Sequence, residues 1–190
     1  MTELTRETKE TNIICKVDTK GNGTSNINTG VGFFDHMLEA LSKHSGIDIE
    51  LSCKGDLHID AHHTVEDCGI VLGKALKNEI FPIKNVERYG NATVVMDEAA
   101  TTCALDLSNR PYLVYEVNVS GKVGDFDVEL VEEFFHALSG NAGLTVHIIQ
   151  DRGRNKHHIL EASFKAFAVA LRRAMTKNDN LGIPSTKGVL

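Results

Sequence analysis

Residues 32–53, GFFDHMLEALSKHSGIDIELSC, decide the fold, because residues 129–150, ELVEEFFHALSGNAGLTVHIIQ, repeat their pattern 97 positions further along the chain. In both stretches apolar side chains recur at i, i+1, i+4, i+5 and i+8, which is the spacing of an amphipathic helix. A glycine ends each helix, Gly46 in the first and Gly143 in the second, as is typical of helix C-termini. Alternating apolar residues then predict one strand after each helix.

The duplication continues into a second pair of helices. HHTVEDCGIVLGKAL, from His62, and HHILEASFKAFAVAL, from His157, carry the same stripe of apolar positions and lie 95 residues apart. Strand-like segments precede the first helix of each copy. They lie at residues 11–17 and 24–29 in the first copy and at 92–96, 101–107 and 112–119 in the second. Each half is therefore predicted to be β-β-α-β-α.

We predict an α/β (α+β) fold built from two such halves. A half of about 95 residues buries little apolar surface alone, so the two are expected to share one core. The chain of 190 residues is then a single domain. Its repeats are expected at about residues 1–86 and 87–176, followed by an extended C-terminal tail at residues 177–190.

Charge and composition disfavour several classes of protein. The formal net charge of −6 opposes general binding to nucleic acid, whose phosphates are also negative. No apolar run approaches the roughly 18 residues that span a bilayer, and the polar N-terminus does not resemble a signal peptide. The four cysteines form no CxxC pair, which is typical of a reduced, cytoplasmic protein.

Each helix of the second pair opens with His-His-x-x-Glu, a pattern that can bind metal. At about 100° per residue these three side chains share one arc of the helix. Imidazole and carboxylate together suit manganese, zinc or iron. The two rings of a pair are splayed, so each histidine can serve a different ion. The groups concerned are His62, His63 and Glu66 in the first copy and His157, His158 and Glu161 in the second.

The first helix of each copy offers further candidate ligands. His36 lies on the polar side of FFDHMLEAL, and its repeat equivalent is Glu133. His136, one turn along from Glu133, is a competing candidate at that place. Two metal motifs at equivalent positions of a duplication are hard to obtain by chance, so the sequence indicates a metal protein.

Several longer stretches resemble the imidazoleglycerol-phosphate dehydratase family of histidine biosynthesis. They are RETKETNI, NTGVGFFDHML, GDLHIDAHHTVED, DLSNRPYL, LVEEFF, HHILEASFKAFAVAL and PSTKGVL. The resemblance covers essentially the whole chain and implies a monofunctional enzyme, without the phosphatase domain that some relatives carry. It implies two mixed sheets with a helical layer, related to the second domain of ribosomal protein S5.

The implied activity is that of a hydro-lyase. Its substrate would be D-erythro-1-(imidazol-4-yl)glycerol 3-phosphate, and its product 3-(imidazol-4-yl)-2-oxopropyl phosphate. The proton to be removed is not next to a carbonyl, so a lone base cannot take it quickly. Metal acting as a Lewis acid would favour a deprotonated ring, which can expel the hydroxyl to give a diazafulvene whose neighbouring proton a carboxylate can take. The resemblance also implies two Mn²⁺ per chain, held at subunit interfaces of a 24-subunit homo-oligomer.

Roles carry over from the family by matching motifs. Glu10 in KET matches the base, and the eighth metal position, a histidine in some relatives, falls on Glu133 here. Arginine suits a phosphate because its fork donates two parallel hydrogen bonds. The implied metal ligands are His36, His62, His63, Glu66, Glu133, His157, His158 and Glu161. The implied phosphate-binding residues are Arg88, Arg110, Lys165, Ser185 and Lys187. Asp106 and Glu98 are weaker candidates and are assigned no role.

Two other classes of function fit part of the pattern. A dinuclear hydrolase of phosphate esters would also use histidine and carboxylate ligands, although such sites are usually richer in aspartate. An RNA-binding or metal-storage module is the second alternative, since fold alone does not fix function. The acidic charge opposes RNA binding, and storage needs no set of arginine and lysine positions.

Overall fold

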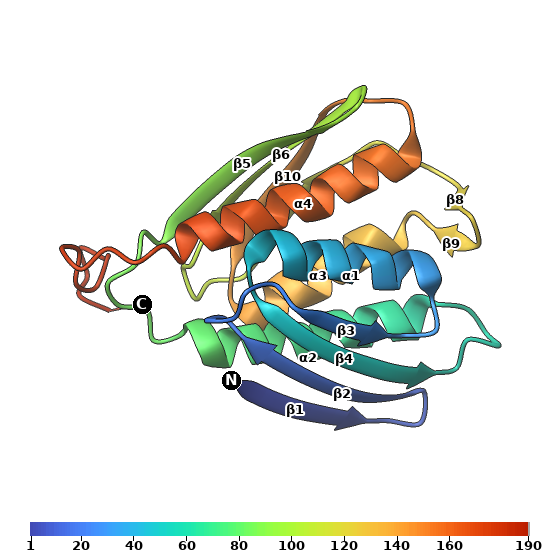
Figure 1. The fold of residues 1–190 in the computed structure, drawn as a ribbon, viewed down its shortest axis with the longest axis horizontal. Helices are drawn as coiled ribbons and strands as arrows, with labels where there is room; N and C mark the ends of the chain where they lie inside the picture. Colours follow the sequence, from blue (N-terminus) through green and yellow to red (C-terminus); the bar gives the residue numbers. More distant parts are fainter. Residues whose placement is uncertain (190) are drawn as a thin grey trace.

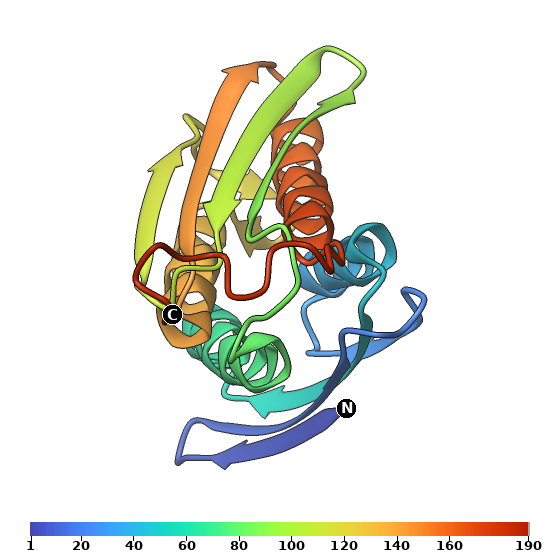
Figure 2. The same ribbon diagram turned by 90° about the vertical axis from the view of Figure 1, so that its left-hand side faces the viewer.

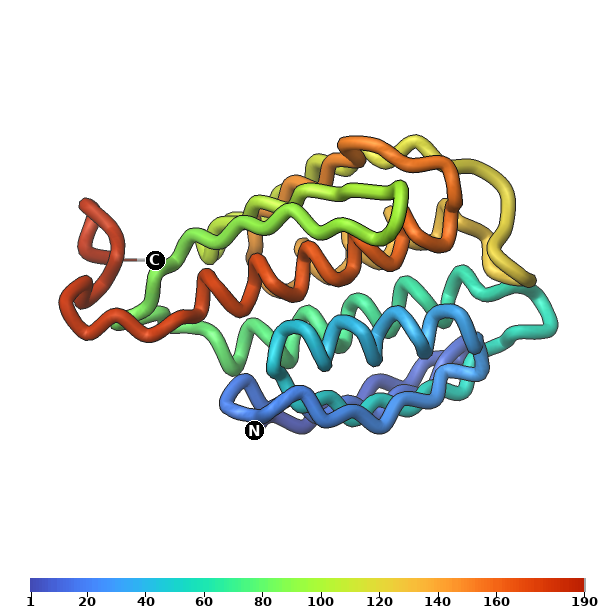
Figure 3. The backbone as a smooth tube through the Cα atoms, turned by 45° about the horizontal axis from the view of Figure 1, so that its top comes forward, coloured from blue at the N-terminus to red at the C-terminus, as the bar shows by residue number. Residues whose placement is uncertain are grey.

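Two four-stranded sheets form the outer layers of the molecule, and four helices pack between them (Figure 1). The computed structural model describes residues 1–189. Leu190, the last residue of the predicted tail, lies outside the described residues. The tube in Figure 3 shows the same layering from another side. None of the helices in this part of the chain combines the length and apolar character that crossing a membrane requires.

The two halves of the chain follow one another in sequence and repeat the same elements. The first half comprises β1 (Thr2–Glu7), β2 (Thr11–Asp18), β3 (Ser25–Asn28), α1 (Gly32–Ser45), β4 (Asp48–Gly55) and α2 (His62–Ile80). The second comprises β5 (Tyr89–Met96), β6 (Ala99–Asp106), β7 (Tyr112–Glu116), α3 (Leu130–Ala142), β10 (Thr145–Arg152) and α4 (Lys156–Ala174). A short hairpin, β8 (Lys122–Val123) and β9 (Phe126–Asp127), is inserted before α3.

The sheets have matching topologies. Their strand orders are β1-β2-β4-β3 and β5-β6-β10-β7, with one parallel pair at an edge of each, β3 with β4 and β7 with β10. This confirms the two mixed sheets and the helical layer. Each half, however, has three strands before its first helix, so the predicted β-β-α-β-α order is one strand short. The missing strand in the first half is β1, an edge strand whose sequence, TELTRE, contains one apolar residue.

The predicted helices and their ends are confirmed. Both α1 and α3 end at a glycine in the left-handed conformation, Gly46 with φ 76° and Gly143 with φ 71°. Only glycine adopts this conformation without steric cost. The apolar stripes face the core, and the equivalent pairs from Phe34 with Val131 to Leu76 with Leu171 are buried. In the first predicted pair, Leu130 is buried and Phe33 is partly buried.

Helices α2 and α3 cross closely in the middle of the molecule. A Cβ atom on Gly69 would lie 2.9 Å from the carbonyl oxygen of Phe134, and one on Gly73 would lie 2.6 Å from that of Leu138. The absence of side chains at these two positions therefore allows the backbones to approach. Since α2 belongs to the first half and α3 to the second, this contact joins the two halves into one core.

The sequence predicted an extended C-terminal tail. In the structure the tail instead turns back across one end of the molecule (Figure 2). Asn85, in the link between the halves, holds it from both sides. Its N–H donates to the carbonyl of Gly182 at 2.6 Å, and its own carbonyl accepts from the N–H of Asn178 at 2.7 Å. These backbone bonds satisfy groups that a free tail would leave to solvent.

Candidate active site

Both His-His-x-x-Glu motifs lie in the first turns of long helices, α2 and α4, and these helices start at the same end of the molecule (Figure 1). Each helix start is fixed by a polar side chain. Asp60 accepts the backbone N–H of His62 at 2.8 Å, and Asn155 caps α4 by accepting that of His157 at 3.0 Å. The duplication thus places two sets of imidazole and carboxylate groups at equivalent positions.

Three of the predicted ligands meet at the start of α4. The His157 Nε2 atom lies 3.1 Å from Glu161 Oε2, and His36 Nε2, contributed by α1, lies 3.6 Å from the same oxygen. One ligand atom from each of the three residues falls within 4.8 Å of the others, so small side-chain movements would let one metal ion bind all three. Imidazole nitrogen and carboxylate oxygen are ligands that manganese accepts, so this cluster fits a metal ion.

The carboxylate of Glu161 is the buried member of the cluster, with a side chain only 7% exposed. Burial alone would raise its pKa, but Lys165 donates to Glu161 Oε1 at 2.7 Å, and this ion pair leaves the pKa below its usual value. Glu161 is therefore ionised and ready to bind a cation. The same contact places Lys165 beside the metal cluster rather than with the other predicted phosphate-binding residues.

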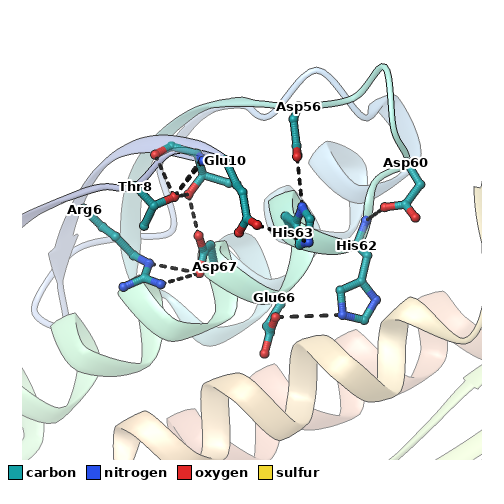
Figure 4. Close-up of polar contacts among 10 residues, drawn as sticks. Arg6, Thr8, Glu10, Asp56, Asp60, His62, His63, Glu66 and Asp67 are labelled. Carbon is teal, nitrogen blue, oxygen red and sulfur yellow. Dashed lines mark hydrogen bonds and ion pairs between the residues drawn. The ribbon is translucent and has the colours of Figure 1, made fainter.

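The motif on α2 is more open (Figure 4). His62 Nε2 lies 3.8 Å from Glu66 Oε2, and His63 Nε2 lies 3.8 Å from Glu10 Oε1. Glu10 comes from the turn between β1 and β2, and its side chain is 53% exposed. Within residues 1–189, His63 is the one ion-pair partner of this carboxylate.

The two imidazoles of each pair point apart, as predicted. The rings of His62 and His63 stand at 90° with centroids 6.0 Å apart, and those of His157 and His158 stand at 81° and 6.3 Å. His157 contacts Glu161, whereas His158 contacts Glu98. Within the described residues, the ligand atoms that cluster around Glu161 therefore include His157 but not its neighbour His158.

The second histidine of each pair is hydrogen-bonded to a carboxylate, and the sequence did not predict either contact. Asp56 contacts His63 Nδ1 at 3.0 Å, and Glu98 contacts His158 Nδ1 at 2.8 Å. These hydrogen bonds raise the pKa of both imidazoles. In return the pKa of Asp56 is lowered, and that of Glu98 falls to about 2, helped by two backbone N–H groups.

Four of the five predicted phosphate-binding residues line one cavity of about 420 Å³. They are Arg88, Arg110, Ser185 and Lys187. Arg88 is the anchor of this cavity, because its guanidinium binds both oxygens of Asp106, at 2.7 and 3.0 Å, and donates to the carbonyl of Pro184 at 2.7 Å. The folded tail is thereby held with its polar residues beside two arginines.

The metal cluster and the cavity lie at opposite ends of α4. His157 is in the first turn of this helix, whereas Arg88 donates its backbone N–H to Ala174 at the last turn. At about 1.5 Å per residue these places are roughly 25 Å apart. Glu133 and His136, the competing candidates on α3, are both exposed, and within the described residues neither side chain has a hydrogen-bond or ion-pair partner.

Comparisons with known proteins agree on one family. A family model described as imidazoleglycerol-phosphate dehydratase matches residues 29–171. Curated proteins of that name are 85% identical in Aliarcobacter butzleri and 65% identical in Sulfurovum sp., each over 190 residues and the whole of both chains.

Solved structures of the same enzyme also resemble this fold. That from Staphylococcus aureus has a TM-score of 0.83 and 42% identity over 94% of this chain and all of its own. That from Pyrococcus furiosus, in complex with (S)-C348, has a TM-score of 0.85 and 38% identity over 98% of this chain and all of its own.

Proposed function

The chain belongs to the imidazoleglycerol-phosphate dehydratase family, and from this premise we propose which of its residues bind the substrate and remove water from it. It is a hydro-lyase that catalyses the dehydration step of histidine biosynthesis. The alternative of a dinuclear phosphate-ester hydrolase is not supported, since family, relatives and structural neighbours all carry the dehydratase name.

The proposal of a metal site rests on the cluster of His36, His157 and Glu161. These three residues would hold one Mn²⁺, and the other five predicted ligands would contribute to a second. When bound, the metal would act as a Lewis acid on the imidazole ring of the substrate. Since the two histidines of each pair point apart, we propose that ligands from neighbouring copies of the chain complete each site.

Glu10 is proposed as the base that takes the proton from the carbon bearing the second hydroxyl. Its carboxylate is exposed, lies 3.8 Å from His63 Nε2, and is not engaged in another ion pair within the described part of the chain. A base must reach the substrate with a free oxygen. The other carboxylates at this end, such as Glu161 and Glu98, are already occupied by lysine, histidine or backbone donors.

The cavity around Arg88 is proposed to bind the phosphate of the substrate. Arg88, Arg110 and Lys187 bring three positive charges, and Asp106 brings one negative charge. The remaining two positive charges match a phosphate dianion. Ser185 adds a neutral donor on the tail. The phosphate does not react, but its binding energy can hold the imidazole end of the substrate in place.

The distance between the metal cluster and the phosphate cavity supports a site shared between copies of the chain. Five bonds of about 1.5 Å join the imidazole ring to the phosphorus, so the phosphorus lies at most roughly 7 Å from the ring. It cannot reach from the metal cluster to the phosphate cavity of one chain, which are roughly 25 Å apart along α4. We therefore propose a homo-oligomer, of 24 subunits as the family resemblance implies, with Lys165 joining the phosphate contacts from another copy.

Two measurements test the proposal. The protein incubated with imidazoleglycerol phosphate and Mn²⁺ is expected to release the ketone product, and elemental analysis is expected to find about two Mn²⁺ per chain. His157→Ala is expected to lose metal and turnover together. A variant that kept full metal content would contradict the ligand assignment.

We place the enzyme in the cytoplasm, since its four cysteines are unpaired and a reducing compartment maintains thiols.

A further inference from the structure

A carboxylate binds the Nδ1 atom of the second histidine in each His-His pair. Asp56 Oδ2 lies 3.0 Å from His63 Nδ1, and Glu98 Oε2 lies 2.8 Å from His158 Nδ1. Both distances are those of hydrogen bonds, and the shorter one, to Glu98, is in the range of a charge-assisted bond. The opposite nitrogen of each ring points elsewhere: Nε2 of His63 lies 3.8 Å from Glu10 and Nε2 of His158 lies 3.8 Å from Asp97. The side-chain amide nitrogen of Asn155, which can only donate, also lies 3.5 Å from His158 Nε2.

The two halves reach this contact from different elements. Asp56 directly follows β4, whereas the residues between β10 and α4 in the second half, at 153–155, are Gly-Arg-Asn and include no acid. Glu98 supplies the missing carboxylate from the turn before β6. Its counterpart in the first half is Glu10, which occupies the same place before β2. Among the residues that the structure describes, Glu10 contacts Nε2 of His63 and no Nδ1 atom.

Glu98 is fixed by more than its histidine. Its Oε1 atom accepts the backbone N–H groups of Arg154 at 3.0 Å and Asn155 at 2.7 Å, while Oε2 contacts His158. Asn155 is the residue that caps α4. These three contacts hold the side chain of Glu98 in place, and through it they orient the His158 ring.

We propose that Glu98 is a positioning residue that holds the proton of His158 on Nδ1 and leaves the Nε2 lone pair free for a metal ion, as Asp56 does for His63. A neutral imidazole has one N–H and one acceptor nitrogen, and an ionised carboxylate can only accept. Metal ligands must present the unprotonated nitrogen, and such outer carboxylates fix the tautomer and orientation of a ligating histidine. This inference rests on the proposed ligand role of both histidines.

The arrangement also separates the roles of two equivalent glutamates. Because Asp56 occupies Nδ1 of His63, Glu10 is left exposed and able to exchange a proton with the substrate. Because no acid follows β10, Glu98 is committed to His158 and to the backbone of the α4 cap. Glu98 is therefore not a second base, although it matches Glu10 in the duplication.

The test compares Glu98→Gln with Glu98→Ala. The amide oxygen of glutamine can still accept the two backbone N–H groups, but its NH₂ group then faces Nδ1 and opposes a proton there. Asp151→Asn is the control, because Asp151 accepts from the hydroxyl of Thr102 at 2.7 Å rather than from a histidine. Two properties are measured on the full-length protein: the tautomer of His158, and Mn²⁺ affinity by competition with a chromophoric chelator.

The tautomer is read from ¹⁵N NMR of metal-free, histidine-labelled protein at a pH where the imidazoles are neutral. The signal of His158 is identified by its loss in His158→Gln. We expect Nδ1–H in the parent and the control, and loss of that tautomer in Glu98→Gln. We also expect Mn²⁺ affinity to fall about 10–100-fold in Glu98→Gln, as for other outer carboxylates.

The outcomes separate positioning from a structural role. If Glu98→Gln keeps the parent tautomer and Mn²⁺ affinity, Glu98 only holds the backbone before α4 and the proposal is overturned, whatever Glu98→Ala does. If Glu98→Gln changes the tautomer while neither parent nor variant binds Mn²⁺, the positioning stands and the proposed metal function fails. If His158 of the parent protein carries its proton on Nε2, the proposal is wrong.

Discussion

Arg88→Ala is expected to destabilise the protein and weaken substrate binding at the same time. The Arg88 side chain is 10% exposed and that of Asp106 is 17% exposed, so this is a largely buried ion pair. Removing one partner of such a pair typically costs about 3–5 kcal/mol, because the other charge stays buried and unpaired. Since Asp106 retains some contact with water, we expect a loss near the lower end, about 3 kcal/mol in the free energy of unfolding.

The same substitution releases the tail. Arg88 Nη1 donates to the carbonyl of Pro184, next to Ser185, and a hydrogen bond from a charged group contributes about 1.5–3 kcal/mol. If this bond sets the position of the tail in the phosphate cavity, KM rises by at least about tenfold, since 1.4 kcal/mol corresponds to a factor of ten. The free energy of unfolding is measured by urea titration at fixed protein concentration, and KM by steady-state kinetics with Mn²⁺.

A second variant separates the two effects. Arg88→Ala combined with Asp106→Ala removes the unpaired carboxylate, so the double variant is expected to be more stable than Arg88→Ala alone. Its KM is expected to stay raised, because the anchor of the tail is still missing. A loss below about 1 kcal/mol in Arg88→Ala, with no recovery in the double variant, would refute the buried-pair reasoning.

Three further predictions concern single side chains. Lys187→Ala is expected to weaken competitive inhibition by inorganic phosphate about tenfold or more, from the loss of one charged hydrogen bond; unchanged inhibition would remove Lys187 from the phosphate contacts. Glu10→Gln is expected to lower kcat by about 10²–10⁴-fold with Mn²⁺ content unchanged, and a variant within about threefold of the parent would mean that another group takes the proton. The pKa of Asp48 is lowered by hydrogen bonds from the backbone N–H groups of Thr24 and then Asn22. Its stabilisation is therefore present above its unfolded pKa of about 3.9 and is lost as pH falls through the lower folded value. Asp48→Asn is expected to flatten the fall in Tm over that acidic range, and an unaltered acid slope would show that Asp48 does not contribute.

The repeated helices could be predicted from sequence because their signals are local. Phe33 and Leu130 begin the same apolar stripe, and Gly46 and Gly143 end the two helices. Burial of one face and the left-handed conformation at a C-terminus follow from spacing and residue type alone. The splayed histidine pairs also follow from helical geometry, since neighbouring residues differ by about 100° around the axis.

Other features depend on contacts between distant residues and left no local signal. Strand β1 pairs as an edge strand through its backbone, with Leu4 as its one apolar residue. Asp56 and Glu98 acquire their contacts only when a loop and a turn approach the helix starts. The distance between the metal cluster and the phosphate cavity likewise emerges only from the path of α4, and it supports the site between subunits that the family resemblance implied.

A mixing experiment tests the shared site most directly. His157→Ala removes a metal ligand, and a variant with Arg110→Ala and Lys187→Ala together removes phosphate contacts, so each alone is expected to be nearly inactive. Co-assembled in equal amounts, they form some sites that take the metal end from one variant and the phosphate end from the other. Random pairing of two chains predicts recovery of up to about one quarter of parental activity, because a shared interface combines residues of both. Activity no greater than the sum of the separate variants would contradict a site built between chains.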